Sequence, residues 1–243
     1  MSRGRLARYS LWQFRDFFLE RGIAIFIIGF LWGYALVAPL RAMVAQTSGP
    51  GRPSAVWPII LQMASAVVSL SVLIAVNGIV STDRKSGYYR FLFSKPVNAA
   101  LYYVQLFFVY MMGVLAVMFV LASLLRTIFP AFSILNLLMY AALIYIAMGG
   151  IGFFLSVATR YDWLTLAAVW LGSRLLRAVY GAKPDWRSKA VELLPPVHKL
   201  DDVANTLIGK GTAVTSDVLW LFGYGALFFA LGLLILRRGS LAD

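Results

Sequence analysis

The sequence predicts an all-α membrane protein with six transmembrane helices, and three observations lead to this fold class. The 243-residue chain is 61% hydrophobic and only 13% of its residues are charged, whereas soluble domains carry roughly 25% charged residues. Its apolar residues gather in runs of the roughly 20 residues that a membrane-spanning helix needs. These runs are far too long for barrel strands, and a helix satisfies its own backbone hydrogen bonds within lipid.

The first 21 residues are expected to form an amphipathic helix that lies in the membrane interface. Leu11, Phe14 and Phe18 recur at helical spacing, and Arg8 and Arg15 contribute to a polar side. The alternative is that this stretch only flanks the first span and has no further role.

Six apolar runs follow, within a single transmembrane domain that covers residues 1–243. The predicted spans are 22–40, 58–80, 100–125, 134–159, 164–180 and 218–236. The fifth contains Arg174 and Arg177, which share a helix face because they are three residues apart. These arginines either snorkel to the membrane surface or contact a substrate.

Basic residues orient these spans and place both termini in the cytosol. The numbers of Lys and Arg on the two sides are close, but short loops and the first helix have the greatest weight. The N-terminal arginines and the basic connection between spans two and three therefore decide the orientation. Because the net charge of +12 comes from residues that flank spans, nucleic acid is not expected as a partner. The expected location is the cytoplasmic membrane, which the chain crosses several times.

The connection between the second and third spans, residues 81–99, is more elaborate than a turn requires. It interleaves charged and aromatic residues, begins with residues that can cap a helix, and contains Pro96, which stops a helix near Ser94. The pattern predicts a short interfacial helix, which Gly87 is expected to shorten or kink. This helix either anchors the chain in the membrane or docks a cytosolic partner and transmits its motion.

The outer segment, residues 181–217, is the least membrane-like part of the chain. It contains three prolines and several charged residues. It forms either a cap or re-entrant element on the outer side or a solvated loop.

The sequence lacks the motifs that would make this chain an enzyme. It has no G-x-x-x-x-G-K-[ST] phosphate loop, no H-E-x-x-H and no G-x-S-x-G. It has no cysteine, and its one histidine, His198, is interpreted as structural. We expect no catalytic residue, no metal and no cofactor bound by this chain. Asn77 and Gln105 either pack helices together or line a substrate path.

The chain resembles the permease subunits of the type-2 ABC exporter family. Residues 83–97, D-R-K-S-G-Y-Y-R-F-L-F-S-K-P-V, are similar to that family's D/E-R-x-x-G…L-x-S-x-P-V pattern. The basic lead-in, the L-P-P-V-H-K-L-D-D stretch at Leu194–Asp202 and the last apolar run with its basic ending follow the same order.

This resemblance implies two permease chains, identical or related, with two cytosolic ATPase subunits that bind ATP and Mg. Residues 83–95 would be the coupling helix in an ATPase groove, and 181–217 would form the outer gate region. The coupling residues would be Asp83, Arg84, Lys85, Gly87, Tyr88, Arg90, Phe91 and Lys95. The apolar interior favours a hydrophobic or amphipathic substrate, and the resemblance implies its export. The alternatives are a non-transport scaffold or assembly subunit of a larger complex and a membrane enzyme that acts on lipid.

Overall fold

The computed structural model describes residues 3–33, 57–85, 87, 98–130, 132–159, 162–180, 197–212 and 214–238. All regular secondary structure in these ranges is helical, which confirms the predicted all-α class. Four helices are long and apolar enough to cross a membrane: Pro58–Lys85, Ala99–Ile128, Ile134–Ala158 and Thr215–Arg237. The chain is therefore a helical, multi-pass membrane protein.

The chain forms two compact units. The first contains Met1–Ala75, Val109–Ala142 and Asp201–Thr215, and the second contains Val76–Phe108, Leu143–Leu200 and Ser216–Asp243. Two long helices, α6 (Ala99–Ile128) and α7 (Ile134–Ala158), contribute residues to both units. Their bounds agree closely with the predicted spans 100–125 and 134–159.

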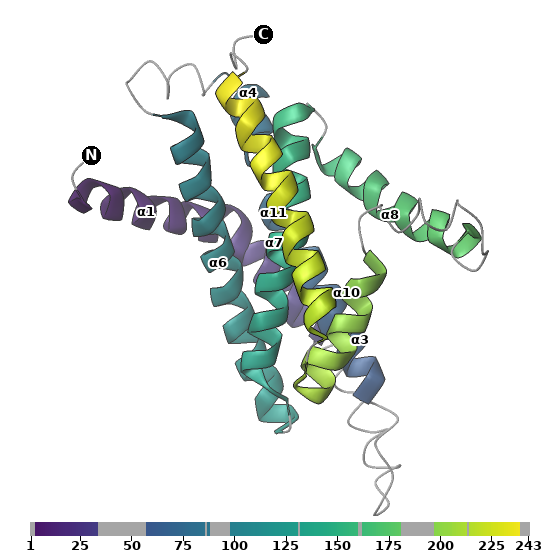
Figure 1. Ribbon diagram of the computed structural model, residues 1–243. Helices are drawn as coiled ribbons and strands as arrows, with labels where there is room; N and C mark the ends of the chain where they lie inside the picture. Colours follow the sequence, from purple (N-terminus) through teal and green to yellow (C-terminus); the bar gives the residue numbers. More distant parts are fainter. Residues whose placement is uncertain are drawn as a thin grey trace, which may run out of the picture. The chain divides into compact units, whose positions relative to one another are not determined.

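The N-terminal lead-in is helical, as predicted. α1 (Arg3–Phe17) passes through a π-helical turn at Phe18–Gly22 into a helical stretch that reaches residue 33, and residues 34–40 of the predicted first span lie outside the described residues. Phe17 is fully buried, and its ring centre lies 5.1 Å from that of Tyr110 on α6. Figure 1 shows that α1 runs across α6 rather than along it, as a helix in the membrane interface would.

A tight turn separates α3 (Trp57–Val76) from α4 (Ser81–Lys85). Gly78 lies just after α3 with a φ of 75°, and this left-handed conformation ends a helix most readily at glycine. The helical part of the predicted span 58–80 therefore stops at Val76. Gly87 also has a left-handed φ, 69°, so no continuous helix runs through it, in agreement with the expected break.

Two glycines allow α7 and α11 (Thr215–Arg238) to touch backbone to backbone in the second unit. A Cβ atom added to Gly150 would collide with the backbone of Gly225, and one added to Gly225 would collide with the backbone at Ile146. Small residues are common where membrane helices approach closely. Figure 1 shows α11, in yellow, crossing α7. α11 contains the predicted span 218–236.

α8 (Asp162–Tyr180) covers the predicted fifth span, 164–180, but is not among the four apolar helices. It contains charged residues at Asp162, Arg174 and Arg177. Leucines on its second half are exposed, and in Figure 1 the helix diverges from α7. Whether it crosses the membrane stays a prediction.

Part of the outer segment 181–217 forms a buried helix. α10 (Val197–Val203) continues through a π-helical turn at Ala204–Ile208. Leu200, Val203 and Leu207 are almost fully buried. For the described residues of this segment, these side chains favour a cap or re-entrant element over a solvated loop.

Candidate coupling site

A buried serine on α7 caps the first turn of α4. The backbone N–H groups of Val80 and Ser81 both donate to Ser156 Oγ, each at 3.0 Å, and Ser156 is fully buried. The first N–H groups of a helix have no partner within it. A hydroxyl from another helix satisfies these two, so the start of α4 is fixed to α7.

Arg84 makes a second connection to α7. Its Nη1 donates to the carbonyl oxygen of Val157 at 2.8 Å. The last carbonyls of a helix lack intrahelical partners and carry partial negative charge. A guanidinium at the end of α7 therefore satisfies a carbonyl and complements the helix dipole.

Asp83 connects α4 to α6. Tyr103 Oη donates to Asp83 Oδ2 at 3.2 Å, and Tyr103 is fully buried near the start of α6. The two charged residues thus reach different helices, Asp83 toward α6 and Arg84 toward α7. We use the name α4 contacts for three connections: the Ser156 cap, the hydrogen bond from Arg84 to Val157, and the hydrogen bond between Asp83 and Tyr103.

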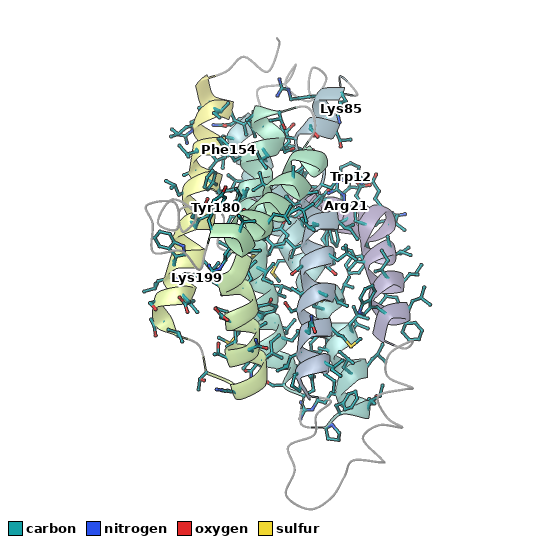
Figure 2. The ribbon with its side chains drawn as sticks, turned by 90° about the vertical axis from the view of Figure 1, so that its right-hand side faces the viewer. Trp12, Arg21, Lys85, Phe154, Tyr180 and Lys199 are labelled. Carbon is teal, nitrogen blue, oxygen red and sulfur yellow. The ribbon has the colours of Figure 1, made fainter. Side chains whose placement is uncertain are left out.

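The predicted coupling residues divide into three groups in the structure. Asp83 and Arg84 are half-buried and turn toward the helices, so their described contacts lie within the chain. Lys85 and Gly87 are exposed, and Figure 2 shows Lys85 at the end of α4. Four residues lie outside the described residues, namely Tyr88, Arg90, Phe91 and Lys95.

The structure does not gather the four predicted path residues at one place. Asn77 is exposed in the turn after α3, within the candidate span Pro58–Lys85, and Gln105 is half-buried on α6. Arg177 is exposed near the end of α8, which is compatible with snorkelling, and the side chain of Arg174 lies outside the described part. A substrate path through these residues stays a prediction.

Arg21 connects the end of the N-terminal lead-in to the last turn of α3. Its Nη1 donates to the carbonyl oxygen of Ala75 at 2.5 Å, and its guanidinium carbon lies 4.9 Å from the centre of the Tyr110 ring. Both contacts lie in the first unit, and Figure 2 labels Arg21 beside α3. A cation at the last turn of α3 complements its dipole, and the contact with Tyr110 is a cation–π interaction.

An ion pair joins the start of α10 to α11. Lys199 Nζ lies 2.7 Å from Asp217 Oδ1, and the same amine lies 5.9 Å from the centre of the Trp220 ring. Figure 2 shows Lys199 beside the first turns of α11. The predicted outer segment is therefore connected to the last helix by its own charged residues.

Among the described residues, no group of His, Asp or Glu side chains could hold a metal ion. Comparison with family models and with curated proteins finds no match to this chain. The functional interpretation therefore depends on the sequence pattern and on the α4 contacts.

Proposed function

We propose that this chain is the membrane-spanning permease subunit of an ATP-binding cassette exporter. It would have six spans, with both termini in the cytosol, and would act in the cytoplasmic membrane. Two cytosolic ATPase subunits would bind ATP and Mg, and a second permease chain would complete the pathway. The substrate would be hydrophobic or amphipathic.

The observation that carries this proposal is the position of α4. α4 is held to α6 and α7 by hydrogen bonds at Asp83, Arg84 and Ser156, while Lys85 at its end is exposed. A force applied to the residues after Lys85 would therefore reach two apolar helices. Motion passes between domains through such packed and hydrogen-bonded elements.

We propose different roles for two groups of coupling residues. Tyr88, Arg90 and Phe91 would contact the ATPase, because aromatic residues and arginine contribute most to protein interfaces. Asp83 and Arg84 would instead pass the movement of the ATPase on to α6 and α7.

Purification from native membranes tests the docking role. We expect the tagged chain to co-purify with an ATP-binding cassette ATPase, identified by mass spectrometry, and to lose it when Tyr88, Arg90 and Phe91 are changed to Ala. A matched triple change of Leu171, Leu175 and Val179 on the exposed face of α8 should leave the complex intact. Recovery of the ATPase with the first triple variant, or of no ATPase with the parent chain, would contradict the proposal.

A further inference from the structure

A groove in the first unit lies between the helical stretch described as far as residue 33, α3 and α6. It contains about 820 Å³ of space that no atom fills, counted out to its open side. Val68, Met118 and Leu137 form a fully buried floor, whereas Phe30 and Leu124 at the rim are exposed. No lining residue is charged.

The groove is about as long as one leaflet of the bilayer. On α6 its wall runs from Met118 to Ile128, and ten residues of helix rise by about 15 Å. The hydrocarbon core of a bilayer is about 30 Å thick, so one leaflet accounts for about 15 Å. Since α3 and α6 both belong to candidate spans, a groove between them would lie at the depth of the hydrocarbon core.

A glycine leaves part of the groove open. A Cβ atom added to Gly33 would meet no atom within 4 Å, whereas one added to Gly29, one turn earlier, would meet a methyl group of Leu121 at 2.5 Å. A side chain at Gly29 would therefore press on the flexible side chain of Leu121, whereas one at Gly33 would meet open space. A larger side chain at Gly33 would occupy the groove without displacing its walls.

An exposed cation lies at the same end of α6 as the groove. Arg126 comes directly after the lining residue Leu125 and is exposed. A long basic side chain at the end of a span reaches the headgroup region of the bilayer. Its charge complements a phosphodiester.

We propose that this groove binds one acyl chain of a phospholipid whose phosphate lies at Arg126. An unfilled apolar groove would forfeit dispersion contacts along its walls, and its lining offers too few polar groups to hold water. Apolar walls of leaflet length, a cation at one end and an opening toward lipid together fit this occupant. The inference does not depend on the transport function.

Intact-protein mass spectrometry tests the site. The detergent-purified full chain is incubated with palmitoyl-oleoyl phosphatidylglycerol and compared with two variants. Gly33→Leu fills the groove. Gly223→Leu is the control on α11, because an added Cβ there also meets nothing within 4 Å. Leucine favours a helix more than glycine does, so neither change should weaken its helix. We expect the parent and the control to retain one lipid per chain and Gly33→Leu to lose it. Equal retention by all three would overturn the proposal and indicate adventitious lipid.

Fluorescence of Trp32, which lines the groove, gives a second measurement that does not require the Gly33 variant. The Trp32 signal is the difference in tryptophan fluorescence between the parent and Trp32→Phe. In nanodiscs of brominated phosphatidylcholine, this signal should be strongly quenched. Addition of excess non-brominated phosphatidylglycerol should restore it, and Arg126→Gln should weaken that restoration. A Trp32 signal that bromine does not quench would show that something other than a lipid chain fills the groove.

Discussion

At the residue scale, Ser156 shows how a short helix is held by a distant part of the chain. Two backbone N–H groups of the α4 turn depend on its hydroxyl, and the site is buried, so water does not replace it. The hydroxyl of Ser81, only 2% exposed, has no hydrogen-bond partner among the described residues. These two serines therefore form a matched pair, one needed for a cap and one not.

We expect Ser156→Ala to lower the free energy of unfolding by about 1–3 kcal/mol, because it leaves buried donors unsatisfied. Ser81→Ala removes a hydroxyl that already lacks a partner and should leave stability nearly unchanged. Thermal melting of the detergent-purified variants measures both effects. Equal melting temperatures for the two variants would contradict the capping role of Ser156.

The sequence indicated the coupling residues but not the direction in which they face. Asp83 and Arg84 were expected to contact an ATPase together with Lys85, because the resemblance to type-2 ABC permeases places all three in the coupling helix. Their partners, Tyr103 and the Val157 carbonyl, are 20 and 73 residues away. No local pattern identifies such partners.

At the element scale, α4 is short and is held by hydrogen bonds to α6 and α7. We therefore expect that docking of the ATPase and coupling to these helices can be lost separately. Tyr103→Phe and Arg84→Ala each remove one of the α4 contacts but leave residues 88–95 unchanged. If the chain is a permease, both variants should retain the ATPase while substrate-stimulated ATP hydrolysis by the reconstituted complex falls. Tyr102→Phe, on the neighbouring half-buried tyrosine, serves as the control. Loss of ATPase association in Tyr103→Phe would assign that residue to docking instead.

The packing of α7 on α11 depends on two glycines. Gly225→Ala places a methyl group against the backbone at Ile146, and such overpacking costs about 1–3 kcal/mol. Gly223→Ala, two residues earlier, meets open space and should stabilise the helix by about 0.5–1 kcal/mol. Unfolding in increasing concentrations of a denaturing detergent should therefore move the unfolding midpoints of the two variants in opposite directions from that of the parent. Equal tolerance of both changes would mean that the helices do not meet at Gly225.

At the scale of the whole molecule, the number of spans depends on α8. Its length fits a crossing, but its composition, which includes Asp162, Arg174 and Arg177, leaves it outside the four apolar helices. Because the protein has no cysteine, single cysteines at Asp162 and Tyr180, the two ends of α8, can be labelled without background. Six spans predict that a membrane-impermeant maleimide reaches these two positions from opposite sides. Labelling of both from one side would make α8 an interfacial helix.

The sequence by itself determined the all-α fold class and the approximate extents of the long helices α6, α7 and α11. Apolar runs of spanning length need no knowledge of their neighbours, because the bilayer imposes the same requirement on each helix. The end of α3 at Val76 was also visible in principle, since Asn77–Gly78 is a turn signal. The broken helix at Gly87 followed from the conformational freedom of glycine.

Only the tertiary structure decided what each polar residue does. Ser156 caps a turn 75 residues away, Arg21 reaches the end of α3, and a space remains beside Gly33 because no neighbouring side chain enters it. Within a long apolar run, one serine or glycine has the same local signal as another. Its role depends on which helix faces it, and that is set by packing between residues far apart in the chain.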